Sequence, residues 1–288
     1  MAEALAYAKI NLTLDILRRR EDGYHDMRMV MQSVSLCDRL TIRTGAGCGV
    51  RIDSNLSYLP EDRSNIAAKA AEIFFAETGI SPVGLAVELE KHIPVCAGMA
   101  GGSSDGAAML RFLRDTLSPA LEQEELERIG ALVGSDVPFC LRGGTALAEG
   151  RGEVLTDLPP LPECTIVLCK PDFPISTPEL FAAVRLRRLR CHPDTAGMRE
   201  ALEAGDLIGV ARRLYNVFED VLPRKYRRVF ELKRALLDLD ALGASMTGSG
   251  PTVFGLYADH QRAAEAAEAL RERGELVFLS QTVGRIGN

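Results

Sequence analysis

Apolar and polar side chains alternate along residues 5–17. Every second position is apolar: Ile10, Leu12, Leu14 and Ile16. The positions between them are polar: Lys9, Asn11, Thr13 and Asp15. This period of two is typical of a strand in an antiparallel sheet that buries one face. We therefore expect residues 5–17 to form a strand with one apolar and one polar face.

The same patterns, together with glycine and proline breaks, predict the rest of the secondary structure. Further strands are expected at 24–36, 40–43, 49–53, 83–89, 165–169, 244–246, 252–257 and 276–282. Helices are expected at 65–78, from the glycine-rich segment to 117, at 122–133, from 134–138 onward, and at 178–186, 198–204, 207–215, 226–237 and 261–273. Their order indicates an α+β protein rather than a doubly wound sheet. The proline cluster at 159–162 places a boundary between predicted domains 1–158 and 159–288.

Composition narrows the function classes. The 288 residues are 47% hydrophobic and 26% charged, as in a globular enzyme, and the net charge of −6 argues against a nucleic-acid-binding face. An anionic substrate would therefore need a local positive site. The seven cysteines and four histidines show no metal-binding spacing, so we predict no protein-held metal and reduced thiols. No apolar run approaches the roughly 18 residues of a membrane span, which favours a cytoplasmic protein.

A glycine-rich segment leads into a predicted helix. It reads Pro94, Val95, Cys96, Ala97, Gly98, Met99, Ala100, Gly101, Gly102, Ser103, Ser104. Small residues let the backbone approach a phosphate chain, and the start of a helix offers free N–H donors. The segment is no Walker A loop, because no Gly-Lys-Ser/Thr ends it. It is a candidate phosphate-binding loop, and the alternative is a tight connection that binds nothing.

Three further positions are chemical candidates. Lys9 lies on the polar face of the first strand, where the ordinary alternative is a side chain directed to solvent. Asp136, in Gly134-Ser-Asp-Val-Pro138, is either a functional carboxylate or a helix N-cap. A second glycine loop, residues 245–251, is either a substrate-binding loop or a plain turn.

The order of these motifs resembles that of the GHMP kinase superfamily, named for galacto-, homoserine, mevalonate and phosphomevalonate kinases. The motifs are Ala8-Lys-Ile-Asn11, Asp22-Gly-Tyr-His25, the glycine-rich segment, Gly134-Ser-Asp-Val-Pro-Phe139 and Thr247-Gly-Ser-Gly250. The first two resemble in particular the members that phosphorylate the 2-hydroxyl of a cytidine diphosphate-linked methylerythritol in the non-mevalonate route to isoprenoids. The resemblance implies an N-terminal domain like domain 2 of ribosomal protein S5, a C-terminal ferredoxin-like domain, and an active site between them.

The resemblance also assigns roles to residues. Lys9 and Asp136 match the catalytic pair, and residues 94–104 match the loop that holds the ATP phosphates, with Mg²⁺ bound to the nucleotide. Positions that hold the cytidine-bearing substrate correspond to Asn11, Tyr24, His25, Thr177 and Phe181. Asn65 and Lys91 fall near the nucleotide of ATP. A small-molecule substrate and ATP are thus the expected partners, with no nucleic acid or membrane, for a monomer or homodimer.

The chain departs from the family pattern at three places: Ala97 in the loop, Asp105 after the serine pair, and Met31 where an aromatic residue would line the pocket. Two other functions stay open. Another GHMP kinase would have no reason to keep Tyr24-His25 together with Phe181. An inactive nucleotide-binding regulatory protein would be expected to lose Lys9 or Asp136.

Overall fold

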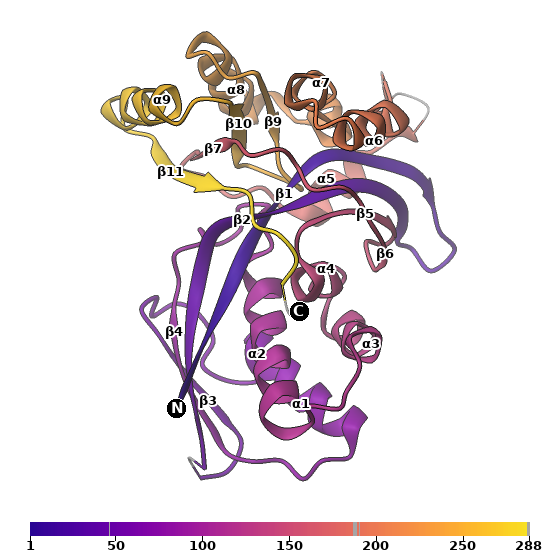
Figure 1. Cartoon of the computed structure of the whole chain (residues 1–288), viewed down its shortest axis with the longest axis vertical. Helices are drawn as coiled ribbons and strands as arrows, with labels where there is room; N and C mark the ends of the chain where they lie inside the picture. Colours follow the sequence, from indigo (N-terminus) through magenta and orange to yellow (C-terminus); the bar gives the residue numbers. More distant parts are fainter. Residues whose placement is uncertain (46, 187–188, 190, 287–288) are drawn as a thin grey trace.

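The computed structural model describes residues 1–45, 47–186, 189 and 191–286, and it divides into two halves that each contain a sheet (Figure 1). The N-terminal sheet has the order β3-β4-β2-β1-β8, and β5 pairs with β2 and with β6. Its strands are β1 (Ala2–Arg19), β2 (His25–Thr44), β3 (Val50–Ser54), β4 (Leu85–Glu90), β5 (Thr145–Gly150), β6 (Val154–Asp157) and β8 (Tyr215–Asn216). Three helices contact it: α1 (Ile66–Thr78), α2 (Gly101–Leu117) and α4 (Val137–Arg142). A fourth helix, α3 (Gln123–Val133), packs on these three helices.

The C-terminal half is built on an antiparallel sheet with the order β11-β7-β10-β9. Its strands are β7 (Thr165–Lys170), β9 (Gly243–Met246), β10 (Val253–Tyr257) and β11 (Leu276–Gln281). The helices are α5 (Thr177–Ala183), α6 (Thr195–Glu203), α7 (Leu207–Arg212), α8 (Arg228–Asp238) and α9 (His260–Glu272), with 3₁₀ turns η2 (Val217–Val221) and η3 (Arg224–Tyr226). Helices α8 and α9 cover the outer face of this sheet in Figure 1. The predicted mixture of helix and strand in two halves is confirmed.

Strand β1 joins the two halves. Its residues Ala8, Ile10 and Leu12 share a hydrophobic cluster with Ile166 and Leu168 of β7. The opposite face of β1, predicted to be polar, is also buried, because the glycine loops of both halves cover Lys9 and Asn11. The strand therefore carries its polar side chains into the boundary between the halves.

The second strand departs from the prediction, because the expected break between 36 and 40 is absent and β2 runs without interruption to Thr44. The polar residue Asp38 looks like a turn signal, yet its side chain is fully buried and accepts hydrogen bonds from Lys91, His92 and Ile93. Buried polar groups need such partners, and here they come from a loop more than fifty residues away.

Smaller differences lie around strand ends. The hairpin of β5 and β6 was not predicted, and the helix expected at 207–215 ends at Arg212. The chain then forms the short strand β8, which pairs in parallel with β1.

Within the part of the chain that the structure describes, no helix is long and apolar enough to cross a membrane. The domain boundary placed at 158/159 stays a prediction.

Candidate active site

The glycine-rich segment forms a loop that ends at the N-terminus of α2. Cys96 and Ala100 take left-handed conformations, with φ of 54° and 60°, although they are not glycine. Gly98 is also left-handed, with φ of 76°, and a Cβ there would lie only 2.2 Å from the carbonyl oxygen of Thr247. Only glycine fits this approach, so the loop is shaped by contact with the second glycine loop.

Lys9 lies where the two glycine loops meet. Its Nζ donates hydrogen bonds to Asn11 Oδ1, at 2.7 Å, and to the carbonyl oxygen of Gly98, at 3.0 Å. The same Gly98 oxygen accepts a hydrogen bond from Thr247 Oγ1, at 3.3 Å. The Lys9 side chain is only 5% exposed. The predicted alternative of a solvent-directed lysine is therefore wrong, and the ammonium is fixed inside the site.

Asp136 points at Lys9 rather than at the backbone of its own helix. Its Oδ2 lies 4.0 Å from Lys9 Nζ, and its side chain remains 34% exposed toward the cleft. Although Asp136 occupies the N-cap position of α4, its side chain makes no capping hydrogen bond. The capping role that we left open is thus not what holds this carboxylate in place. A solvent-accessible carboxylate beside a buried cation is suited to accept a proton from a bound hydroxyl group.

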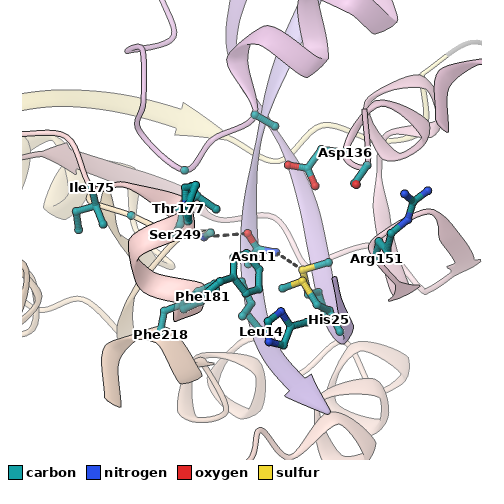
Figure 2. Close-up of a pocket in the computed structure, with 18 of the residues that line it drawn as sticks. Asn11, Leu14, His25, Asp136, Arg151, Ile175, Thr177, Phe181, Phe218 and Ser249 are labelled. Atoms are coloured by element: carbon teal, nitrogen blue, oxygen red, sulfur yellow. Dashed lines mark hydrogen bonds between the residues drawn. The ribbon is translucent and has the colours of Figure 1, made fainter. Parts of the chain in front are cut away.

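A cleft of about 820 Å³ opens between the halves around Lys9 and Asp136. Figure 2 shows Asp136 and Arg151 on one side of this cleft and Thr177, Phe181 and Ser249 on the other. A second cavity, of about 320 Å³, lies on the other side of the glycine-rich loop. Both cavities are lined by the same four loop residues: Cys96, Gly98, Ala100 and Ser103. The loop therefore separates two binding spaces and faces both.

Aromatic side chains line the far end of the larger cleft. The Phe181 ring stacks on His25, with centroids 5.0 Å apart and planes at 19°, and meets Phe218 edge-on (Figure 2). Tyr24 is 56% exposed, and the guanidinium of Arg151 lies 5.4 Å from its ring centroid. Burial, with a contribution from Arg19, lowers the pKa of His25, which leaves this imidazole neutral at pH 7. The structure thus brings Phe181 into one cleft with Tyr24 and His25, which are far from it in sequence.

The other two substrate positions have different surroundings. Thr177 is exposed at the start of α5, and its hydroxyl lies 2.6 Å from that of Ser249 in the second glycine loop. Asn11 is fully buried, and its Oδ1 accepts from Lys9 Nζ and from the backbone N–H of Gly248, at 3.0 Å. Its Nδ2 faces Met29 Sδ at 3.4 Å. The amide of Asn11 therefore connects the lysine to the second loop.

The two residues expected near the nucleotide both line the smaller cavity, but their side chains have protein partners. Asn65 is the N-cap of α1: its Oδ1 accepts from the N–H of Ala67, and its Nδ2 donates to Pro60 O. Lys91 is buried and bonds Asp38 and Asp105. Both residues therefore shape the wall of the cavity through contacts with other protein groups.

Arg151 is a cleft residue that the sequence analysis missed. It lies in the turn between β5 and β6, and a Cβ on the next residue, Gly152, would be 3.9 Å from Asp136 Oδ1. Among the described residues that line the cleft, the lysine and arginine side chains are Lys9 and Arg151. The Gly150-Arg-Gly152 sequence is a turn signal, and recognising that hairpin would have pointed to this cation.

Comparisons with known proteins place the chain in a family. Residues 65–144 match the GHMP kinases N terminal domain, and residues 198–276 match the GHMP kinases C terminal domain. The 4-diphosphocytidyl-2-C-methyl-D-erythritol kinases of Clostridium botulinum and Clostridium kluyveri are 40% and 41% identical to it, each over 96% of this chain and 99% of the relative. The chain belongs to the 4-diphosphocytidyl-2-C-methyl-D-erythritol kinase family. The resemblance found in its motifs is confirmed.

A solved structure supports the assignment to the 4-diphosphocytidyl-2-C-methyl-D-erythritol kinases. A crystal structure of 4-(cytidine 5'-diphospho)-2C-methyl-D-erythritol kinase superposes with a TM-score of 0.83 and 33% identity, covering 98% of this chain and all of that one. The predicted GHMP kinase fold is therefore confirmed, and the chain is a kinase of a family that uses ATP.

Proposed function

We propose that this kinase transfers the γ-phosphoryl group of Mg·ATP to the 2-hydroxyl of 4-diphosphocytidyl-2-C-methyl-D-erythritol. The observation that carries the proposal is the arrangement of two cavities on either side of one glycine-rich loop, with Lys9 and Asp136 at the larger one. In this arrangement the nucleotide occupies the smaller cavity and the phosphoryl acceptor the larger one. The family membership supports the same reaction.

The smaller cavity suits a nucleotide. Leu59, Pro60 and Ile66 provide an apolar wall against which an adenine ring would pack. Gly101, Gly102 and Ser103 form the first turn of α2, where free backbone N–H groups and the positive end of the helix dipole attract phosphate oxygens. Since the loop also lines the larger cleft, a γ-phosphate bound there reaches toward Lys9.

The transfer itself needs positioning and charge compensation more than covalent help from the protein. The acceptor hydroxyl approaches Asp136, whose carboxylate takes its proton as the oxygen bonds to the γ-phosphorus and ADP leaves. Lys9, fixed by Asn11 and Gly98, lies beside this point and offsets the charge on the transferring group.

Mg²⁺ is expected to enter as part of the nucleotide substrate. Among the described residues, no group of three His, Cys, Asp or Glu side chains is arranged to hold a metal ion. The phosphate oxygens of ATP are the natural ligands of Mg²⁺.

Arg151 and the aromatic residues suit the other end of the substrate. With a net charge of −6, the protein repels an anionic diphosphate at long range. Lys9 and Arg151 supply local positive charge in the cleft, although Arg151 also pairs with Glu153 at 3.4 Å. Tyr24 and Phe181 line the cleft and are the aromatic rings proposed to stack on a pyrimidine, and His25 stacks on Phe181.

The reaction is tested by ADP release in a coupled assay with four acceptors: the cytidylyl substrate, mevalonate, homoserine and galactose. We expect turnover with the first alone. Robust turnover of mevalonate or homoserine without any of the cytidylyl substrate would contradict the proposal and favour another GHMP kinase. Nucleotide binding without turnover of all four would favour the inactive regulatory protein.

Replacing Phe181 with Ala should raise the KM for the cytidylyl substrate roughly 5–150-fold while leaving the KM for ATP unchanged. The reason is the loss of one stacking face, worth about 1–3 kcal/mol for a base on an aromatic ring. Because Phe181 also packs on Phe218, the melting temperature should fall as well. Steady-state kinetics with each substrate varied in turn measure both constants. Two unchanged KM values with a lower melting temperature would make Phe181 a core residue only.

Replacing Gly102 with Val should raise the KM for ATP by roughly tenfold and leave that for the cytidylyl substrate nearly unchanged, because the side chain would block phosphate approach to the loop. Gly102 is the better position for this test. A Cβ there meets only Ile66, at 3.4 Å, whereas a Cβ on Gly101 would lie 3.3 Å from Lys91 Nζ. Equal changes in both KM values, together with a loss of stability, would indicate a plain turn.

A further inference from the structure

Two carboxylates share one ammonium group beneath the start of α2. Lys91 Nζ donates to Asp38 Oδ2 and, at 2.6 Å, to Asp105 Oδ2, and all three side chains are buried. The ammonium lies against the first residue of the helix, since a Cβ on Gly101 would be 3.3 Å from it. Lys91 and Asp105 both line the smaller cavity. With all three groups ionised, the cluster would carry one net negative charge at the place proposed for nucleotide phosphates.

The two carboxylates are not equivalent. Asp38 has donors on both oxygens, because its Oδ1 accepts from the N–H groups of His92 and Ile93, at 2.6 and 2.8 Å. Asp105 accepts from Lys91 on Oδ2, but its buried Oδ1 has no hydrogen-bond partner. A buried carboxylate oxygen without a donor is costly, whereas a protonated carboxyl group needs fewer donors and can itself donate. The carboxylate of Asp38 bonds the same Lys91 ammonium and is thus a neighbour of Asp105.

The surrounding groups also favour a protonated carboxyl group at Asp105. Burial raises the pKa of Asp105 to about 8, although the charge of Lys91 acts to lower it. Burial acts to lower the pKa of Lys91, but Asp105 and Asp38 outweigh it and raise that pKa. These directions favour a protonated Lys91 and a protonated Asp105 at neutral pH.

No further cation is directed at Asp105 from the elements packed around it in the described chain. Lys69 of α1 donates to Val133 O, Arg111 of α2 donates to Cys140 O and Leu5 O, and Lys9 of β1 donates to Gly98 O. The thiol of Cys140 in α4 stays neutral, because burial raises its pKa. The protonation of Asp105 thus depends mainly on Lys91 and Asp38.

We propose that Asp105 is a neutral carboxylic acid in the working enzyme, and that its proton keeps the Asp38–Lys91–Asp105 cluster uncharged beneath the nucleotide phosphates. Asp105 is then a positioning residue for nucleotide binding. The inference rests on the proposed function, since it places the nucleotide phosphates at the start of α2. Ionisation of Asp105 gives the cluster a net charge of −1, which repels the phosphates. Nucleotide affinity therefore falls as the pH rises through the pKa of Asp105, and binding above that pH takes up a proton.

The test is calorimetric titration of the enzyme with Mg·ADP from about pH 7 to about pH 9.5. The matched variant is Asp105→Asn, which has the shape and donor capacity of the protonated acid but cannot ionise. In the wild type we expect the Kd to rise about three- to tenfold per pH unit above about pH 8. In the variant we expect tight binding with a flatter pH profile. Titration in two buffers of different ionisation enthalpy should show uptake of a fraction of one proton by the wild type and less by the variant.

An infrared measurement makes the test independent of affinity. With ¹³C-labelled aspartate, the carbonyl stretch of a protonated carboxyl group should be present in the wild type at neutral pH, disappear as the pH is raised, and be absent in Asp105→Asn. Identical pH profiles for the two proteins, or no such band in the wild type, would overturn the inference while leaving the kinase reaction intact. A failure of both folded proteins to bind Mg·ADP at any pH would instead overturn the proposed function, and the inference with it.

Discussion

Replacing Asp136 with Asn is expected to lower kcat on the order of 10²–10⁴-fold without unfolding the protein, the usual scale for the loss of a positioned general base. Asn keeps the size of the side chain and caps a helix as well as Asp does. Since Asp136 makes no capping hydrogen bond, the substitution removes a proton acceptor and leaves α4 unchanged. The effect should appear in kcat, because ATP and the cytidylyl substrate keep their other contacts.

The measurement is steady-state kinetics with saturating Mg·ATP, accompanied by a melting curve. The matched control is Asp157→Asn, which removes an exposed carboxylate that pairs with Arg142 and Arg285 away from the cleft. We expect the control to stay within about twofold of the wild-type kcat, because Asp157 does not line the cleft. Activity of Asp136→Asn close to that of the wild type would remove Asp136 from the reaction.

Replacing Lys9 with Met is expected to lower kcat roughly 10²–10³-fold, since it deletes the cation that lies beside the transferring phosphoryl group. Met fills a similar volume, but it leaves the oxygens of Asn11 and Gly98 without their lysine donor. A drop in melting temperature should therefore accompany the loss of activity.

A control variant separates the effect of the Lys9 charge from the effect of the contact between the two glycine loops. Thr247→Val removes the hydroxyl that bonds the same Gly98 oxygen but changes no charge, and its kcat should fall less than about tenfold. The two variants are compared by kcat and by melting temperature. If Lys9→Met and Thr247→Val lose the same activity for the same loss of stability, Lys9 holds the loops together and has no electrostatic role.

Local signals predicted the fold well where structure depends on neighbours in sequence. Asn65 was expected to begin a helix, and its side chain caps α1. The hairpin that carries Arg151 was missed because both strands are short and β5 is rich in alanine, which has weak strand propensity. This hairpin matters for the site because the tertiary fold places it next to Asp136.

Long-range contacts explain the remaining differences within the site. The family resemblance grouped Asn11 with the substrate positions. In the structure, the side-chain oxygen of Asn11 accepts a hydrogen bond from the backbone N–H of Gly248, which belongs to the other half of the chain. Lys91 similarly acquires two carboxylate partners from different elements, β2 and α2. Residue types and motif order identify which side chains matter, whereas their hydrogen-bond partners depend on the tertiary fold.

Because β1 contributes to the cores of both halves, we do not expect the two halves to fold independently of each other. A fragment ending at residue 158 would expose Ala8, Ile10 and Leu12, which are fully buried against β7 in the whole chain. Such a fragment is expected to aggregate or remain loosely packed. The same shared strand resists a hinge motion of one half against the other, since a wide opening would pull this cluster apart. We therefore expect ligands to enter and leave without a wide opening of the two halves, while β1 holds Lys9 in place between them.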